Sequence, residues 1–450
     1  MKRVGRLTMG CVLLLIAACQ PTATVISGPS LSGRLDVNDV SILFPLPKSQ
    51  SDLSRLIAIK DIASINGDPV FPKTDFRQII DLAQSPASKI KTRQIGLPDS
   101  IQKFSSWRIA GIRFDSSAPG SSADIRAQFG TRPQIRLVVQ PVTEQHDVIT
   151  VHDFALHIIY DFIAPSSSNK PSADTTAVTA IVSDLLRLKK MAKEGGVDTD
   201  GVLSIHPGLA APHMTTALSR EFASFLSSHL TVSRFNSAAI MGLDNGRREP
   251  WIFLSMFRRR PVSQLFMALP SPGLDQTATG QTAQMISFLD DPNVLPLPST
   301  TNRKAAPSGK SNAELLLGVS TAVLFNPNVS LDVPAIIGAD TAGRPIQDAL
   351  LTNRDIADWI AHPEKSHFFN TDCVSCHSET TRRAQLDITP GAMAFRPAAG
   401  VSGLDPSLIP TDRWNVRNFG WFGSNETITQ RTANETAEVV DFINRTMFAH

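Results

Sequence analysis

The sequence contains few cysteines, and this scarcity limits how the protein can be held together. Its 450 residues include 4 Cys, and Cys11 lies in an N-terminal segment with the features of a signal peptide. If that segment is removed and Cys19 is modified, only Cys373 and Cys376 remain as thiols. Exported proteins that depend on disulfides are usually rich in them. We therefore expect no disulfide framework and a separate role for the last two thiols.

The sequence also lacks a second apolar run that could cross a membrane. The longest later run, Leu315–Phe325, has 11 residues and includes two hydroxyl side chains, whereas a spanning helix needs about 20 apolar residues. The motifs of serine hydrolases, zinc metalloproteases, dinucleotide-binding enzymes and P-loop enzymes are all absent. Nothing in the sequence therefore indicates a hydrolase or a nucleotide-dependent enzyme.

No excess of charge of one sign is present. The chain has 43 basic and 41 acidic residues, a net charge of +2. Loss of Lys2, Arg3 and Arg6 with the signal segment leaves 40 basic against 41 acidic residues, a net charge of −1. This balance argues against a nucleic acid as partner. With 42% apolar residues, the chain can bury a sizeable core, and its length suggests two or three domains.

Residues 1–18 have the pattern of an export signal. A basic start is followed by the short apolar run Cys11–Ala18, which is too short to span a bilayer. The segment Ile16-Ala17-Ala18-Cys19 resembles the lipobox of bacterial lipoproteins. That resemblance implies cleavage before Cys19, lipidation of its thiol and, because Gln20 follows, placement in the outer membrane. The alternative is an ordinary signal peptide with an incidental cysteine.

The stretch Cys373-Val374-Ser375-Cys376-His377 carries the clearest chemistry in the chain. Two thiols about one helical turn apart can add to the two vinyl groups of one porphyrin, and a histidine directly after them can ligate the iron. The stretch resembles the haem-binding motif of cytochromes c. That resemblance implies one haem c, held covalently by Cys373 and Cys376, with His377 as the proximal ligand. The alternatives are a zinc half-site, a redox dithiol or a disulfide.

The sixth iron ligand decides between electron transfer and ligand-binding chemistry. Met393, in a proline-bounded loop 16 residues after His377, is the leading candidate, because cytochromes c with a thioether ligand place it after the motif. Other candidates are Met447, His362 and His367, and an open or water-bound site is the remaining possibility. Two further groups are candidates for the haem surroundings: the propionate partners Arg382 and Arg383, and the aromatic cluster Trp414, Phe419, Trp421 and Phe422.

The rest of the chain divides by composition and periodicity. We expect a signal peptide at residues 1–18, a tether at 19–40, an α+β domain of unknown role at 41–298, a linker at 299–312 and a haem domain at 313–450. Period-two alternation predicts strands at Trp107–Phe114, at Gln134–Val139 and over residues 154–162, although a helix from near Thr150 also fits the last. Helical spacing predicts helices at 176–194, 215–230 and 354–361. A final helix is expected to begin with a capping box at Thr432–Glu435 and to bury Thr436, Val440, Ile443 and Met447.

The sequence as a whole thus predicts an α+β fold, with a mixed N-terminal domain followed by a mostly α-helical cytochrome c-like domain. We expect an exported, lipid-anchored monohaem electron carrier on the periplasmic side of a bacterial membrane, with a protein as redox partner. Two alternatives remain open. One is a peroxidase-like enzyme or redox sensor with an open sixth site. The other is a binding lipoprotein whose N-terminal domain carries the function.

Overall fold

The computed structural model describes residues 33–84, 97–165, 171–243, 353–365, 403–410 and 417–448 as continuous stretches. It also describes 251–259, 264–267, 274–276, 282–284, 320–322 and single positions between 376 and 395. The predicted signal peptide, Cys19, the linker at 299–312, Cys373 and Met393 lie outside the described residues.

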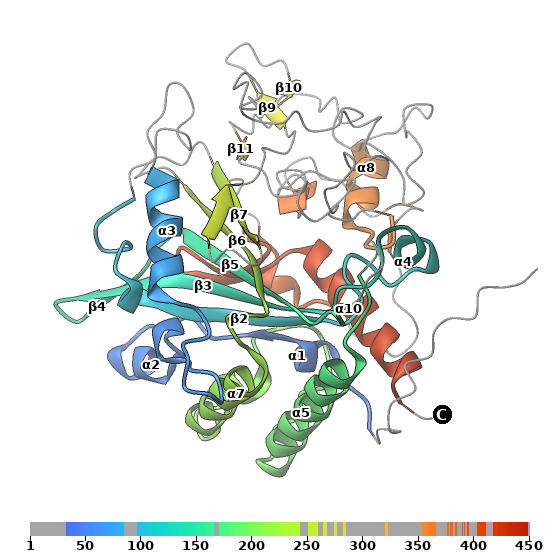
Figure 1. Cartoon of the computed structure of the whole chain (residues 1–450), viewed down its shortest axis with the longest axis horizontal. Coiled ribbons are helices and arrows are strands. Elements are labelled where there is room, and N and C mark those ends of the chain that lie inside the picture. The colour runs from blue at the N-terminus through green and yellow to red at the C-terminus, as the bar shows by residue number, and fades with distance from the viewer. Residues whose placement is uncertain are drawn as a thin grey trace, which may run out of the picture.

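An antiparallel nine-stranded sheet forms the centre of the described part of the chain (Figure 1). Its strand order is β1-β2-β3-β5-β6-β7-β11, with β4 paired to β3 and β8 paired to β7. The strands of this sheet are β1 (Ser41–Leu43), β2 (Trp107–Asp115), β3 (Gln134–Gln145), β4 (Val148–Val151), β5 (Phe154–Asp161), β6 (Phe235–Leu243), β7 (Trp251–Arg259), β8 (Gln264–Met267) and β11 (Ser320–Ala322). Two separate hairpins consist of β9 (Leu274–Gln276) with β10 (Thr282–Gln284) and of β12 (Phe419–Phe422) with β13 (Asn425–Ile428).

Helices surround the sheet, so the predicted α+β class is confirmed. They are α1 (Val37–Val40), α2 (Gln50–Arg55), α3 (Lys73–Gln84), α4 (Ala123–Phe129), α5 (Thr175–Glu194), α6 (Pro207–Ala210), α7 (Thr215–His229), α8 (Asn353–Ala361) and α10 (Gln430–Thr446). Short 3-10 helices occur at Ile59–Asp61, Phe104–Ser106 and Pro406–Leu408. The predicted strands at Trp107–Phe114 and Gln134–Val139 and the predicted helices at 176–194 and 215–230 are all present. Residues 154–162 form a strand rather than a helix.

The two faces of the sheet pack against different parts of the chain. Alternate residues of a strand point to opposite faces, and the pairing of β2 with β3 puts Ile109 beside Val139 and Gly111 beside Val138. The Val139 face carries Trp107, whose ring lies 5.7 Å from that of Phe76 in α3. The Val138 face meets the C-terminal hairpin of β12 and β13, which lies far from β3 in the sequence.

The hairpin is fixed to this second face by close packing and by hydrogen bonds. The ring of Phe419 lies so close to Gly111 that a Cβ there would approach it to 2.6 Å, which explains a glycine in the middle of a strand. The side chain of Gln140 accepts a hydrogen bond from the backbone N–H of Trp421 at 2.7 Å and donates one to its carbonyl at 2.8 Å. The Trp421 indole donates to the carbonyl of Phe44 at 2.8 Å. Phe419 and Trp421 therefore belong to the hydrophobic core that includes the sheet. The sequence offers them as candidates for the wall of a haem pocket.

Helix α10 packs beside the hairpin and joins the last part of the chain to the first. Thr436 and Ser41 of β1 share a hydrogen bond of 2.8 Å, and the Asn444 amide exchanges two hydrogen bonds with the backbone of Leu35. The predicted apolar face is confirmed, because Thr436, Val440, Ile443 and Met447 are all buried. Buried residues of the hairpin and of α10 belong to the same core cluster as the sheet, on the other side of the boundary predicted at residue 313.

The start of α10 differs from the predicted capping box. The helix begins at Gln430, and its N-cap is Thr429, whose hydroxyl accepts from the N–H of Thr432. Glu435 therefore lies inside the helix, where its carboxylate pairs with arginines of the sheet. The T-x-x-E pattern at 432–435 has the local signature of a cap, but the tertiary ion pairs determine where its glutamate points.

Part of the predicted tether is also folded. Residues 35–40 lie within the range expected to be a flexible linker, yet Leu35, Val37 and Val40 are buried. Asp36 caps α1 in a true capping box with Asp39. Asp39 in turn accepts a hydrogen bond from Lys189 of α5 at 2.9 Å, so this segment is part of the globular body.

Candidate functional site

The described part of the predicted haem motif, Cys376 and His377, lies near the second face of the sheet. Cys376 and His377 are both half-buried and helical in conformation. The ring of His377 faces the ring of His157 in β5, with 6.2 Å between the ring centroids and 44° between the ring planes. The structure thus brings the predicted iron ligand next to a histidine that no pattern in the sequence associates with it.

His157 occupies the middle of the sheet on the face that the C-terminal segment covers. Its neighbours across the strands are Val138 of β3 and Ala239 of β6. Burial, together with the nearby His377 and Arg417, holds the pKa of His157 well below its ordinary value. The imidazole is therefore neutral at physiological pH, which is the form that ligates metals.

Basic side chains surround the histidine pair. The guanidinium of Arg417 is almost completely buried, with 1% of the residue exposed, and burial lowers its pKa to about 10. The positive charges of Arg417, Arg113 and Arg136 all contribute to the lowered pKa of His157. A site with this charge suits an anionic group, because guanidinium pairs with carboxylate in a bidentate fork.

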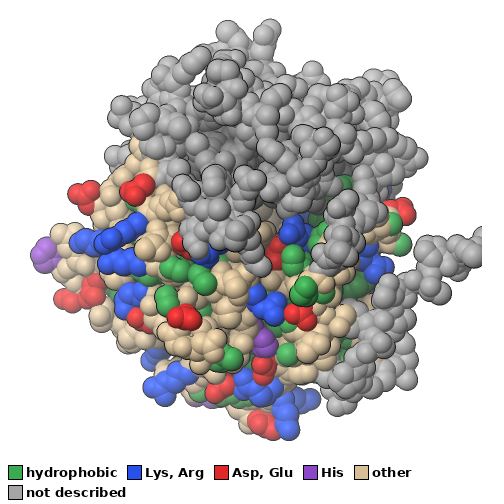
Figure 2. All heavy atoms as spheres, in the orientation of Figure 1, with side chains coloured by type: hydrophobic (Ala, Val, Ile, Leu, Met, Phe, Trp, Pro, Cys, Tyr) green, Lys and Arg blue, Asp and Glu red, His purple; other side chains and the backbone are tan. Residues whose placement is uncertain are grey.

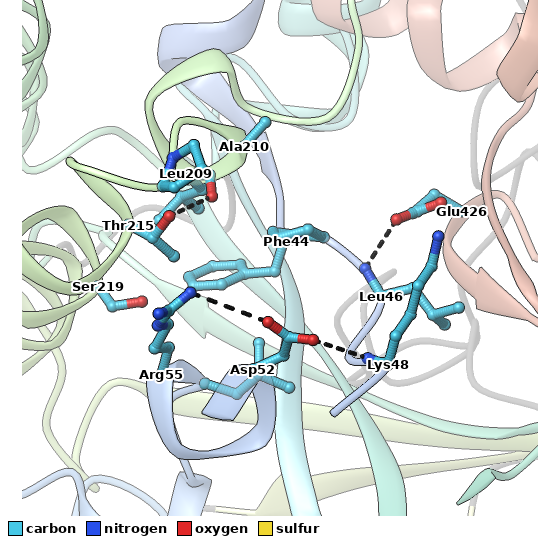
Figure 3. Close-up of a pocket in the computed structure, with 13 residues that line it drawn as sticks. Phe44, Leu46, Lys48, Asp52, Arg55, Leu209, Ala210, Thr215, Ser219 and Glu426 are labelled. Carbon is cyan, nitrogen blue, oxygen red and sulfur yellow. Dashed lines mark hydrogen bonds and ion pairs between the residues drawn. The ribbon is translucent and has the colours of Figure 1, made fainter. Parts of the chain in front are cut away.

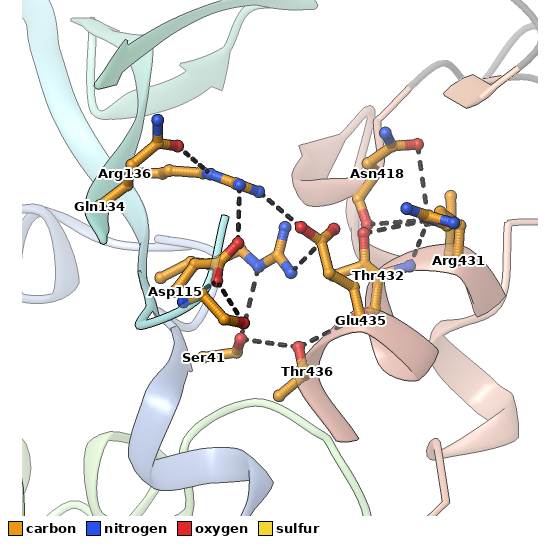
Figure 4. A network of polar contacts seen from close by, with 12 residues as sticks. Ser41, Asp115, Gln134, Arg136, Asn418, Arg431, Thr432, Glu435 and Thr436 are labelled. Carbon is orange, nitrogen blue, oxygen red and sulfur yellow. Dashed lines mark hydrogen bonds and ion pairs between the residues drawn. The ribbon is translucent and has the colours of Figure 1, made fainter. Parts of the chain in front are cut away.

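A network of buried charges connects the sheet to α10 beside this site (Figure 4). Arg136 of β3 bridges Glu435 at 2.7 Å and Asp115 at 2.8 Å, and Arg113 of β2 approaches Glu435 at 3.4 Å. Burial opposes ionisation of Glu435, but Arg136 and Arg113 outweigh it and hold the pKa of this carboxylate below its ordinary value. Glu435 is consequently ionised, and its ion pairs with the sheet fix how α10 lies on it.

The other sequence candidates have different outcomes. Met447 is buried in the core beside Ile443, as the packing alternative predicted. The ring nitrogen of His362 accepts from the N–H of Glu364 at 3.3 Å, and the ring packs edge-on against Phe395. The guanidinium of Arg383 bonds the carboxylates of Glu379 at 2.7 Å and Asp358 at 2.8 Å, which gives it a structural role. His367, Arg382 and Trp414 lie outside the described residues.

Several N-terminal histidines have structural roles. His206 caps α6 by accepting from the N–H of Leu209, and burial lowers its pKa to about 4. His152 shares a hydrogen bond with Thr143 at 2.8 Å, and His229 bonds Asp184 at 2.8 Å. In the stretches that the structure describes, no three His, Cys, Asp or Glu side chains converge as a metal site. A haem iron needs at most two axial side chains, because the porphyrin supplies its other donors.

A separate pocket of about 240 Å³ opens between the start of α2 and α7 (Figure 3). Apolar side chains such as Phe44 and Leu209 line it together with the basic side chains of Lys48 and Arg55. The carboxylate of Asp52 accepts a hydrogen bond from the backbone N–H of Lys48 at 3.1 Å and lies 3.9 Å from the guanidinium of Arg55. The buried hydroxyl of Ser219 finds no hydrogen-bond partner among the described residues. The pocket therefore combines an apolar wall with a polar atom that a bound molecule would satisfy.

No family model, curated protein or solved structure matches the chain. Among the helices that the structure describes, none is long and apolar enough to cross a membrane. Figure 2 shows basic and acidic side chains interspersed over the described surface of one face, in keeping with the near-equal numbers of the two.

Proposed function

We propose that the protein is an exported, lipid-anchored monohaem c-type cytochrome that transfers electrons. The observation that carries the proposal is the complete Cys373–His377 motif in a chain that also begins with an export signal. Covalent haem is attached to such motifs outside the bacterial cytoplasm, so the motif requires an export signal. We further propose that a redox protein on the periplasmic side of the membrane is the partner.

The described residues fit a haem at this position. His377 lies beside a second imidazole, and buried guanidinium groups lie close enough to affect that imidazole electrostatically. A bound haem would supply an iron that alternates between the ferric and ferrous states. The thiols of Cys373 and Cys376 would hold the porphyrin by adding across its two vinyl double bonds. His377 would orient it by donating a ring nitrogen to the iron, and the sheet would shield it from water.

We expect the Cys373→Ala, Cys376→Ala double variant to lose covalent haem completely. Without the two thiols no thioether can form, so acid-acetone extraction should remove any haem that remains. Intact mass and the spectrum of the reduced protein measure the result after production with haem-attachment machinery. Cys11→Ala is the matched control and should keep its haem, because this cysteine lies in the signal segment. A wild-type protein without added haem mass would refute the proposed function.

We expect Cys19→Ser to move the protein from the membrane to the soluble periplasmic fraction. Acyl chains contribute about 0.8 kcal/mol per buried methylene, so anchoring depends on the lipids that this thiol initiates. Fractionation with intact mass measures both position and lipid, and the haem content should not change. Continued membrane association of the variant would show that another segment or a partner anchors the chain.

A binding function for the N-terminal part is the second candidate. The pocket beside Ser219 favours it, because the buried Ser219 hydroxyl has no partner among the described residues and the wall combines apolar with polar and charged side chains. We propose a small amphipathic molecule as the occupant. A thermal-shift screen of such molecules tests this, with Ser219→Ala expected to weaken any binding that is found. The third candidate, an enzyme or sensor with an open iron face, depends on the sixth ligand.

A further inference from the structure

We infer that His157 of β5 is the second axial ligand of the iron, opposite His377, so that the sheet completes the haem site. This inference rests on the proposed haem function and makes it more specific. It replaces a ligand from the loop after the motif with one from the N-terminal part of the chain.

The first support is the position of the two rings. Metal–imidazole bonds are about 2.0 Å long and a ring centre lies about 1 Å beyond its nitrogen, so imidazoles on opposite sides of one metal have centroids about 6 Å apart. The observed separation of His157 and His377 is 6.2 Å. Packed aromatic rings also span about 4.5–7 Å, so a second observation has to decide between ligation and packing.

The second support concerns the hydrogen bonds of the His157 imidazole. Within the described stretches, no hydrogen bond reaches its imidazole, whereas the rings of His152, His206 and His229 each have one. His157 instead stands between Val138 and Ala239 on a covered sheet face. Ligation of a metal would give this imidazole a partner.

The third support is the electrostatic surrounding of the pair. A haem carries two propionates, and Arg417 lies almost fully buried near His157. Arg113 and Arg136 point from the same sheet face, where they also bind Glu435. Because Arg113 and Arg136 are already paired with carboxylates of the network, the charge that favours an anionic cofactor against the sheet is that of Arg417.

Two imidazole ligands have clear consequences for the iron. With His377 and His157 both held to it, a bound haem iron would be low-spin and would have no open face for a peroxide or a gas. A thioether ligand raises the reduction potential, and a second imidazole in its place gives a lower one. The protein would then be an electron carrier rather than an enzyme.

The test compares the full-length wild-type protein with His157→Ala, Met393→Ala and His152→Ala, all produced with haem-attachment machinery. In the oxidised wild type we expect the near-infrared band of bis-imidazole iron, and in the reduced wild type no rapid binding of carbon monoxide. His157→Ala should keep its covalent haem, become high-spin and bind carbon monoxide, and added imidazole should restore the low-spin spectrum. His152→Ala is the control on the same sheet, and it and Met393→Ala should change neither property.

The outcomes separate the two levels of the proposal. A wild-type protein without covalent haem refutes the proposed function itself. A haem-loaded wild type with the sulfur-to-iron near-infrared band, lost in Met393→Ala, overturns only the role of His157. Rapid carbon monoxide binding by the wild type also overturns it, because the site is then open. If His157→Ala does not fold, the wild-type spectra still decide, and His157→Met should gain the sulfur-to-iron band.

Discussion

Replacing Glu435 with alanine is expected to lower the free energy of unfolding by about 3–5 kcal/mol. The carboxylate lies between the guanidinium groups of Arg136 and Arg113, at 2.7 Å and 3.4 Å, on a part of the sheet that α10 covers. Its removal leaves two largely buried cations with Asp115 as the remaining acidic partner in the network. Breaking a buried ion pair costs more than breaking an exposed one, because the charge that stays behind is already desolvated. Denaturant unfolding of the full-length protein measures the change.

Asp441→Ala provides the matched control on the same helix. Asp441 pairs with Arg445 four residues later, and the arginine side chain is 61% exposed. Exposed pairs of this kind contribute about 0.3–0.5 kcal/mol, so this variant should be nearly as stable as the wild type. Equal losses in the two variants would mean that the network of Arg113, Arg136 and Glu435 does not hold α10 on the sheet.

Ending the chain at residue 312, where the sequence predicts the boundary between two domains, is expected to prevent the N-terminal part from folding. The truncated chain lacks the hairpin and α10, which cover one face of the sheet. Loss of a buried Phe or Trp costs about 3–5 kcal/mol, so Phe419 and Trp421 together account for much of the roughly 5–15 kcal/mol by which a domain is stable.

Thermal unfolding followed by circular dichroism, together with binding of a hydrophobic dye, measures this effect. We expect no cooperative transition and strong dye binding by the truncated chain, and a cooperative transition with little dye binding by the full-length protein. A sharp transition in the truncated chain would show that residues up to 312 form an independent domain after all.

The elements that the sequence predicts well are those whose signal is local. Alternation over Trp107–Phe114 and the apolar spacing of 176–194 arise from which face of each element is buried, and the structure has both. The predicted apolar face of the final helix, from Thr436 to Met447, is also buried in the structure. The start of the same helix is not, because Thr429 and Thr432 both fit a cap and only the distant arginines determine where Glu435 points.

The remaining errors concern contacts between distant parts of the chain. Gln140 and Trp421 are 281 positions apart, and Leu35 and Asn444 are 409 apart. Contacts between such distant residues produce no periodic pattern in the sequence. The tether at 19–40 and the separate domain at 313–450 are therefore predicted from composition alone. The thiols and His377 lie within five residues, so the sequence alone predicts a haem site there. His157 carries only a weak signal, a polar ring within the mainly apolar strand β5.

The meeting of Thr436 with Ser41 has a consequence for how the protein matures. On the proposed export route the chain emerges N-terminus first, so Ser41 leaves the cytoplasm 395 positions before the residue it bonds. The face of the sheet that packs against α10 stays uncovered until α10 has also been exported. On that route Cys373, Cys376 and His377 would also emerge before the last helix, so a haem could be attached while the chain is still open. Closure of the fold by the last helix would then come after attachment of the proposed cofactor.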